Sequence, residues 1–276
     1  MIRFVCLAEN MSDSPSLRAE HGLSVYIETQ KHKILFDLGQ SGLFRENAEK
    51  LGIDLKKVDT AIISHGHYDH GGGLAEFIKI NPQAKIYLKS NAFGEYYSNH
   101  GSANKYIGLD LSLADYPNII FTDGELEIDG ELTLFSGVTE RDFYSSANDS
   151  LYMKQNGIFE PDSFLHEQNL VITDGRKQVL ITGCSHSGIV NIVRRFEADY
   201  KTGSSCDVIG GFHLFDVSAQ QYEKPEMICA IADELMKTGA NFHTCHCTGT
   251  EAYSLMKERM KDKLDYFSVG KEIIVK

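Results

Sequence analysis

Positive charge, long apolar stretches and paired cysteine motifs are all scarce in this chain of 276 residues. Lysine and arginine number 27 against 39 aspartate and glutamate residues, which gives a formal net charge of −12. Nucleic acids and anionic membranes bind to cationic surfaces, so this balance argues against both as partners. It does not exclude a small anionic substrate, because bound metal ions would reverse the local field.

No apolar run is long enough to span a bilayer, and the first residues lack the charged and apolar regions of a signal peptide. The six cysteines include no Cys-x-x-Cys pair of the kind that holds a structural zinc ion. Most of them are therefore expected to be buried thiols in a reducing compartment. We expect a soluble cytoplasmic protein without membrane partners, and we leave a homo-oligomer as an open alternative.

With 42% hydrophobic residues, a chain of this length can form one large domain, 1–276. The predicted strands cover residues 2–7, 23–29, 33–37, 58–63, 84–88, 118–122, 131–136, 169–173, 178–182, 207–210, 241–244 and 266–269. The predicted helices cover residues 42–50, 74–80, 188–200, 224–238 and 250–261. Two polar stretches, near 90–117 and 137–165, predict irregular insertions. The first is either a lid over a pocket or an ordinary surface excursion.

The polar loop after the strand at 58–63 carries three histidines and an aspartate within six positions, His65, His67, Asp69 and His70. Imidazole nitrogens and a carboxylate together suit zinc, iron or manganese. His65 and His67 are two residues apart, so in an extended loop they point the same way, and Asp69 and His70 could face a second metal. Three glycines then let the chain bend close to the ions. This arrangement predicts metal binding rather than a histidine-rich surface loop.

A His-x-His-x-Asp-His pattern after a strand resembles the signature of the metallo-β-lactamase-fold hydrolases. The resemblance implies a mixed α/β (α+β) fold, the four-layer αββα sandwich, with metals at one edge between two mixed sheets. It also implies that Asp37, at the end of the strand 33–37, orients the metal loop through hydrogen bonds. The alternative from the residues alone is that Asp37 caps the helix at 42–50.

A Gly-Cys-Ser-His motif at residues 183–186 repeats this logic of an apolar strand, a glycine turn and possible ligands. Enzymes of the superfamily place a bridging aspartate at such a strand end, where this chain has Cys184. The motif resembles one branch of the superfamily, the proteins similar to 7,8-dihydropterin-6-methyl-4-(β-D-ribofuranosyl)aminobenzene-5′-phosphate synthase. The resemblance makes His186 a metal ligand. Cys184 is either a soft ligand or a packed thiol, and the packed thiol is the plainer interpretation.

Two later motifs fit the same branch. His213, after two glycines and a phenylalanine, could reach a metal or the substrate, or could be a hydrogen-bonded structural residue. The final ligand of the superfamily is a histidine at a strand end near the C-terminus, which the resemblance assigns to His246 on the second metal. Cys245 and Cys247 are expected to point away from that metal. Thr248 and the helix start after it offer N–H groups for a phosphate or carboxylate.

The remaining histidines lack such support. His166 precedes a strand where many superfamily members have a ligand, but we interpret it as a surface residue. Four others have no supporting neighbours and are interpreted as ordinary residues: His21, His32, His100 and His243.

The resemblance implies two divalent metal ions, with zinc as the first choice and iron or manganese as alternatives. One would lie between His65, His67 and His186, and the other between Asp69, His70 and His246. A water between them would exist as hydroxide near pH 7, and Asp69 would help to orient it as the catalytic carboxylate. No Gly-x-Ser-x-Gly motif is present, so no serine nucleophile is expected.

We therefore predict a metal-dependent hydrolase that acts on a small anionic substrate, a phosphate- or phosphodiester-containing compound. One alternative is a pterin-related condensing synthase that releases pyrophosphate. Another is a di-iron redox or ligand-binding protein on the same fold.

Overall fold

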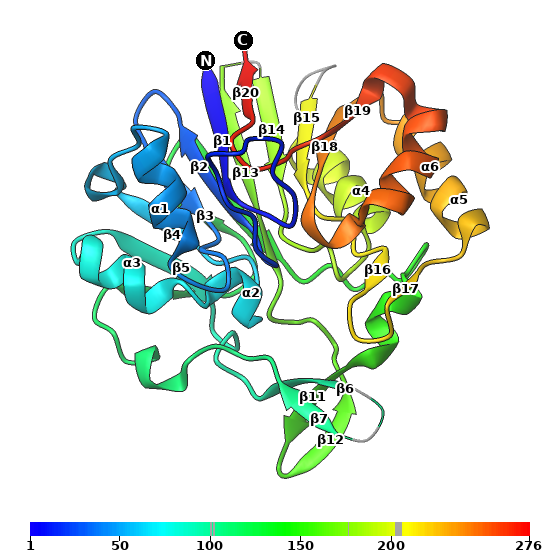
Figure 1. Ribbon diagram of the computed structural model, residues 1–276, viewed down its shortest axis with the longest axis horizontal. Coiled ribbons are helices and arrows are strands. Elements are labelled where there is room, and N and C mark those ends of the chain that lie inside the picture. Colours follow the sequence, from blue (N-terminus) through cyan, green and yellow to red (C-terminus); the bar gives the residue numbers. More distant parts are fainter. Residues whose placement is uncertain (100, 102, 176, 202–205) are drawn as a thin grey trace.

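Two seven-stranded sheets lie face to face, and helices cover the outer face of each, as Figure 1 shows. The computed structural model describes residues 1–99, 101, 103–175, 177–201 and 206–276. The chain forms the layers α, β, β and α in that order. This arrangement confirms the fold class that the metal-loop motif predicts.

The first sheet is built by the N-terminal half of the chain together with the last strand, in the order β20-β1-β2-β3-β4-β5-β8. Its strands are β1 (Ile2–Ala8), β2 (Ser24–Glu28), β3 (Lys33–Phe36), β4 (Thr60–Ile62), β5 (Lys85–Lys89), β8 (Ile119–Thr122) and β20 (Glu272–Val275). The pairs from β3 to β8 are parallel and the others are antiparallel. The carboxyl ends of β3 and β4 therefore meet at one edge.

The second sheet has the order β19-β18-β15-β14-β13-β10-β9. Its strands are β9 (Leu126–Glu127), β10 (Leu132–Ser136), β13 (Gln168–Asp174), β14 (Lys177–Ile181), β15 (Cys206–Gly210), β18 (Asn241–Thr244) and β19 (Leu264–Tyr266). The pairs from β14 to β19 are parallel. The ends of β14, β15 and β18 thus meet at one edge, and each carries a candidate motif.

The helices form the two outer layers. They are α1 (Leu43–Lys50), α2 (Tyr68–Gly71), α3 (Leu74–Ile80), α4 (Ile189–Asp199), α5 (Pro225–Met236) and α6 (Thr250–Met260). The first sheet packs against α1 and α3, and the second packs against α4, α5 and α6 (Figure 1). Within the described residues, none of the helices combines the length and the apolar character needed to cross a membrane.

Alternate side chains of β1 pack on opposite faces of the first sheet, one toward the second sheet and the other toward the outer helices. Phe4 and Cys6 point into the core between the sheets, whereas Val5 and Leu7 pack toward the helices of the first sheet. Successive side chains of a strand point to opposite faces, so a strand buried on both sides is apolar throughout. Each fully buried side chain of this kind contributes roughly 1.5–3 kcal/mol. The loops at the end of the sandwich are therefore anchored on a rigid frame.

The two polar insertions contain four short strands, which corrects in part the prediction of irregular structure for 90–117 and 137–165. They contribute β6 (Tyr96–Asn99), β7 (Asn104–Tyr106), β11 (Leu151–Gln155) and β12 (Ile158–Pro161) to one four-stranded sheet. These strands are short, β7 and β12 are exposed and β6 and β11 are only partly buried, so apolar periodicity does not mark them. The pairing of β6 with β11 joins segments about fifty residues apart and exists only in the folded chain. A two-stranded ribbon, β16 (Phe215–Asp216) with β17 (Gln221–Tyr222), lies near the same end.

Two further elements differ from the sequence prediction at the C-terminal end. The strand expected at 266–269 is β19 at Leu264–Tyr266, and β20 was not expected at all. Half of the residues in β20 are exposed, because it is an edge strand that pairs on one side only. A short, half-exposed strand leaves little apolar signal in the sequence.

An ion-pair cluster ties the turn after β2 to both sheets. Nδ1 of His32 lies 2.7 Å from Asp59, before β4, and its Nε2 lies 3.0 Å from Asp129, before β10. Burial lowers the pKa of His32, but the carboxylates of Asp129 and Asp59 outweigh this effect and raise it. The protonated ring therefore stabilises the contact between the two sheets.

Candidate metal centre

The histidine loop follows β4 and reaches the edge where the two sheets meet. His65 and His67 lie in the loop itself, and Asp69 and His70 lie in the short helix α2. Two of the glycines around them are required by close packing. A Cβ at Gly66 would lie 2.3 Å from the carbonyl oxygen of Ala92, and one at Gly73 would lie 2.2 Å from that of Leu38. The glycines thus allow the loop to fold back tightly on the ends of neighbouring strands.

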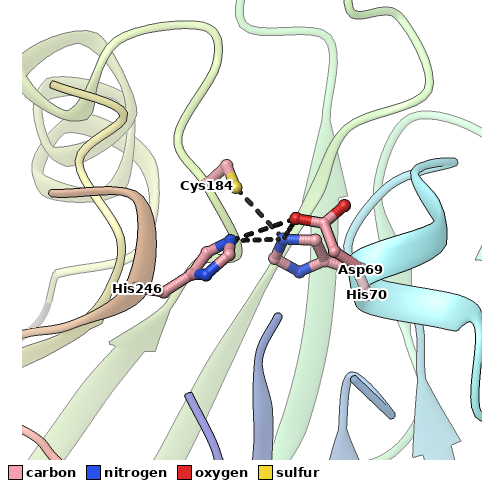
Figure 2. A group of neighbouring side chains, drawn as sticks. All are labelled: Asp69, His70, Cys184 and His246. Carbon is pink, nitrogen blue, oxygen red and sulfur yellow. Dashed lines mark hydrogen bonds and ion pairs between the residues drawn. The ribbon is translucent and has the colours of Figure 1, made fainter. Parts of the chain in front are cut away.

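One group of possible ligands lies between α2 and the ends of β14 and β18, and Figure 2 shows it: Asp69, His70, Cys184 and His246. Nε2 of His70 lies 3.2 Å from Nε2 of His246 and 3.1 Å from Sγ of Cys184. Oδ2 of Asp69 lies 3.2 Å from Nε2 of His246 and 3.6 Å from Nε2 of His70. All of these residues are buried. Four ligand atoms from three distant segments therefore face one another.

A second group of possible ligands adjoins the first and shares Cys184 with it. Nε2 of His65 lies 3.3 Å from Nε2 of His186, and both ligand atoms lie within 4.8 Å of Sγ of Cys184. The ring of His67 lies 4.6 Å from that of His65 and 5.0 Å from that of His186, between centroids. Nε2 of His67 is buried without a hydrogen-bond partner and belongs to a separate group with Asp162 and His166. The structure thus brings His65 and His186 together, with His67 beside them.

Asp37 fixes the orientation of the loop from below. Its Oδ1 accepts the N–H of Ser64 at 2.7 Å, and its Oδ2 accepts the Ser64 hydroxyl at 2.7 Å and Nδ1 of His70 at 2.6 Å. Since the Ser64 hydroxyl donates to Asp37, it can accept from Nδ1 of His65 at 2.8 Å. Both rings then carry their proton on Nδ1 and present the lone pair of Nε2. Asp37 does not cap α1, whose N-cap is Gly42 without a side-chain hydrogen bond.

Two asparagines orient the other pair of rings in the same way. Oδ1 of Asn148 lies 2.9 Å from Nδ1 of His186, while the amide of Asn148 donates to the His186 carbonyl at 3.0 Å. Oδ1 of Asn10 lies 2.8 Å from Nδ1 of His246. An amide oxygen only accepts, so these contacts place the protons on Nδ1 and leave Nε2 free. Histidines that bind metals are held by such partners in just this manner.

The four Nε2 atoms therefore meet in two pairs, and each pair requires a proton or a metal ion between its members. Burial and neighbouring imidazoles lower the pKa of His65 and His186 well below the usual range, so these two rings are neutral near pH 7. Burial also lowers the pKa of His70, but Asp37 and Asp69 outweigh it and raise the pKa to about 9. In the metal-free chain a proton therefore lies between Nε2 of His70 and Nε2 of His246, where a metal ion would bind. Nitrogen, carboxylate and thiol donors fit zinc, iron or a similar divalent ion.

Asp69 is held as a carboxylate by the groups around it. Burial alone would raise its pKa, but His70, His21 and His246 outweigh burial and lower it well below the usual range. Nε2 of His21 lies 3.3 Å from Oδ2 of Asp69, which in turn raises the pKa of His21 although burial lowers it. His21 was interpreted as an ordinary residue, and the structure corrects this. No motif surrounds it, so the sequence holds no signal of its position.

Other residues beside the centre were also missed. The backbone N–H groups of His186 and Ser187 donate to the buried carboxylate of Glu167, at 2.6 and 2.9 Å. The N–H of His246 donates to Glu9, at 3.1 Å, and burial raises the pKa of Glu9 to about 7. Glu9 directly follows β1, so a polar residue at the end of an apolar strand was the available signal. These carboxylates hold the ligand loops in place.

His166 is not a surface residue, which corrects the sequence interpretation. It is 1% exposed, accepts the N–H of Gly66 at Nδ1 (2.9 Å), and lies 3.1 Å from Asp162 through Nε2. It supports the histidine loop. His100 lies outside the described residues.

The residues next to His246 point in different directions: Cys245, Cys247 and Thr248 have different surroundings. Cys245 points into the apolar core between the sheets, as expected, but Sγ of Cys247 joins Cys184 and His213 in a third group within 4.8 Å. The 3₁₀ turn at residues 246–248 breaks strand alternation, which explains this departure. The N–H of Thr248 donates to the Cys245 carbonyl and its hydroxyl accepts the Phe212 N–H. Neither group of Thr248 is therefore free for a substrate.

His213 is buried beside the His186 ring, 4.1 Å between centroids, and both of its ring nitrogens lack a hydrogen-bond partner.

A pocket opens beside these residues, and the sheet formed by the two insertions makes one of its walls. Its lining includes Ser98, Lys105, Ile107 and Leu151 from that sheet and its flanks, together with Asp69, Cys184, His186 and His246. The first insertion thus reaches the candidate centre, since its residues and several of the possible ligands line the same pocket.

The comparisons with known proteins agree with this geometry. The model of the metallo-beta-lactamase superfamily matches residues 17–151. The chain is 31% identical to the 7,8-dihydropterin-6-methyl-4-(β-D-ribofuranosyl)-aminobenzene-5′-phosphate synthase of Methanocaldococcus jannaschii, covering 99% of this chain and 96% of that protein. An uncharacterized protein of the same organism is 32% identical over 92% of this chain and 93% of its own.

A solved structure has the same fold over its whole length. The crystal structure of Tm1679, a metal-dependent hydrolase of the β-lactamase superfamily, matches with a TM-score of 0.81 and 30% identity, covering 100% of this chain and 99% of that one. The motif, the four layers and these relatives lead to one conclusion: the chain belongs to the metallo-β-lactamase superfamily.

Proposed function

We propose that the protein is a metal-dependent hydrolase of a small anionic substrate that contains a phosphate ester or phosphodiester. The observation that carries the proposal is the pairing of oriented Nε2 atoms, of His65 with His186 and of His70 with His246. Two such nitrogens face each other stably when a proton or a metal ion lies between them. One ring of each pair, His186 and His246, lines a pocket, where a substrate can meet the centre.

The proposed ligands are divided between two divalent ions, zinc being our first choice: His65, His67 and His186 for one, Asp69, His70 and His246 for the other. Ions held there supply acidification of a bound water and polarisation of a phosphoryl oxygen. Asp37, Asn10 and Asn148 keep the rings in the orientation that binding needs. The carboxylate of Asp69 lines the pocket, where it would orient that water by accepting a hydrogen bond.

The pocket walls favour a small anionic ligand. Lys105 lines the pocket and lies 5.5 Å from the centroid of the Tyr68 ring, so its charge is placed beside an aromatic face. Ser150 and Ser218 add hydroxyl groups, and Ile107 adds an apolar surface. The Lys105 ammonium would offset the negative net charge of the chain locally and so attract a phosphate group to the pocket. This combination suits a compound with one anionic and one apolar part.

A second candidate rests on the relative in M. jannaschii, which is named a synthase and aligns with nearly the whole chain. That name supports a pterin-related condensation that releases pyrophosphate. Tm1679, equally similar in sequence, is named a metal-dependent hydrolase and supports the first candidate. The third possibility, a di-iron redox or ligand-binding protein, requires iron at the same ligands.

An assay panel with metal analysis separates the three. The chain is stripped of metal and reloaded with Zn²⁺, Mn²⁺ or Fe²⁺, and hydrolysis of phosphomonoesters and phosphodiesters is measured beside pterin-dependent pyrophosphate release. Ester hydrolysis that returns with metal, and that is lost in His67→Ala but kept in the matched variant His243→Ala, supports the hydrolase. His243 lies on β18 beside Asp207 and belongs to none of the ligand groups. Pyrophosphate release without ester hydrolysis, or bound iron without either, refutes the hydrolase.

A further inference from the structure

Cys184 lies at the junction of the two ligand groups. Among the described residues it is the side chain that belongs both to the group of Asp69, His70 and His246 and to the group of His65 and His186. It directly follows the glycine turn after β14 and is 3% exposed. Gly183 leaves no room for a larger residue, since a Cβ there would lie 2.1 Å from the Ser64 hydroxyl. The turn is therefore shaped to bring Cys184 against the histidine loop.

The surroundings of Cys184 are polar, unlike those of a packed thiol. Its Sγ lies 3.1 Å from Nε2 of His70, the ring nitrogen that is available to a metal once Nδ1 has donated to Asp37. Cys245 offers the contrast, because it is fully buried in the apolar core between the sheets and belongs to no ligand group. Cys184 and Cys245, which are far apart in the sequence, thus lie at the same end of the sandwich in opposite environments, one polar and one apolar. Of these two thiols, Cys184 is the one that faces possible metal ligands.

The neighbours of Cys184 also hold its backbone in place. Sγ of Cys247 donates weakly to the Cys184 carbonyl at 3.6 Å, and His213 completes the cluster with two unpartnered ring nitrogens. A sulfur ligand at Cys184 would therefore have Cys247 and His213 on one side and the two groups of possible metal ligands on the other.

We propose that Cys184 is a metal ligand shared by the two halves of the centre, where it takes the place of a bridging carboxylate. This inference rests on the metal binding of the proposed function but not on the substrate. A thiolate is a softer ligand than a carboxylate, so it favours zinc and iron over manganese and magnesium. The exchange of one residue type at this strand end therefore sets the metal preference of the site.

The test uses cobalt(II) bound to the full-length chain, because a cobalt–thiolate bond gives a charge-transfer absorption band in the near ultraviolet that nitrogen and oxygen ligands do not give. We expect the band in the wild-type chain and in Cys245→Ala, the matched buried-cysteine control. We expect Cys184→Asp to bind cobalt without the band. Its preference for zinc over manganese, measured by competition, should fall at least about tenfold.

A band that persists in Cys184→Asp and disappears in Cys247→Ala overturns the assignment, as does a wild-type chain that binds cobalt without any such band. The outcome is separate from that of the proposed function. Ester hydrolysis by a metal-loaded chain without the band would leave the hydrolase standing and refute the thiolate ligand. A chain that shows the band but hydrolyses no ester would support the thiolate ligand and refute the hydrolase. Circular dichroism of each variant checks that the fold is kept.

Discussion

Replacement of Asp37 by asparagine should weaken metal binding without removing any volume from the core. Asp37 is fully buried and accepts hydrogen bonds from Ser64 and from Nδ1 of His70. An amide can still accept the Ser64 N–H at Oδ1, but its NH₂ group then faces Nδ1 of His70. Two donors cannot share a contact of 2.6 Å. In the metal-bound form His70 carries a single proton, on Nδ1; in the variant that proton would have to move to Nε2, the atom that faces His246 and would bind the metal.

The expected size of the effect follows from the role of this partner. Loss of a group that orients a metal-binding histidine weakens metal affinity by about 10- to 100-fold. At free zinc about 100 times the dissociation constant, binding stabilises the folded state by about 2.7 kcal/mol, and a site weakened 100-fold would retain about 0.4 kcal/mol. A loss of about 2 kcal/mol lowers the melting temperature by about 4–8 °C in a chain of this size.

The assay is a zinc titration against a chromogenic chelator, together with thermal unfolding with and without zinc. Glu131→Gln is the matched control, because Glu131 is a buried carboxylate at the opposite end of β2, bonded to Thr29. We expect Glu131→Gln to change stability equally with and without zinc. A folded Asp37→Asn protein that binds zinc as tightly as the wild type would refute the proton assignment at His70.

Three further changes have defined outcomes. His67→Ala should remove bound metal and activity while the protein stays folded, and full metal content by elemental analysis would contradict its ligand role. Gly183→Ala should weaken zinc binding through the 2.1 Å approach of its Cβ to the Ser64 hydroxyl, which the same titration measures. The pKa of His32 is raised by its two carboxylate partners, so their stabilisation is complete below the unfolded pKa, about 6.5, and is lost as pH rises through the folded pKa. His32→Gln should therefore cost about 1 kcal/mol or less at pH 6 and less at pH 9 in urea unfolding, and an equal cost at both would refute this.

The sequence predicted the elements that carry strong apolar patterns. The helix predicted at 74–80 is α3, with the same bounds, and the strand predicted at 241–244 is β18. The sequence did not predict β6, β7, β11 and β12, because these short strands show no such pattern. They form two local hairpins that are joined only by the distant pairing of β6 with β11. The proposal of one domain for 1–276 stays a prediction.

The candidate site was predictable where one segment holds several possible ligands. The loop from His65 to His70 could be recognised from the sequence, because four possible ligands within six positions rarely occur by chance. The resemblance to the superfamily then indicated His186 and His246. His21, Glu167 and His166 carried no comparable signal. Each is a single polar residue whose importance comes from burial against the loop, and burial of one polar residue cannot be inferred from its neighbours in sequence.

The amino-acid sequence by itself determined the superfamily, the alternation of buried strands and the loop that offers metal ligands, since these depend on local order and spacing. The tertiary structure alone decided which nitrogens face one another, where each proton lies and which cysteine meets the centre. Those properties depend on contacts between strand ends that are far apart in the chain. Asp37 and His70, or Cys184 and His246, become neighbours only when the two sheets close on each other.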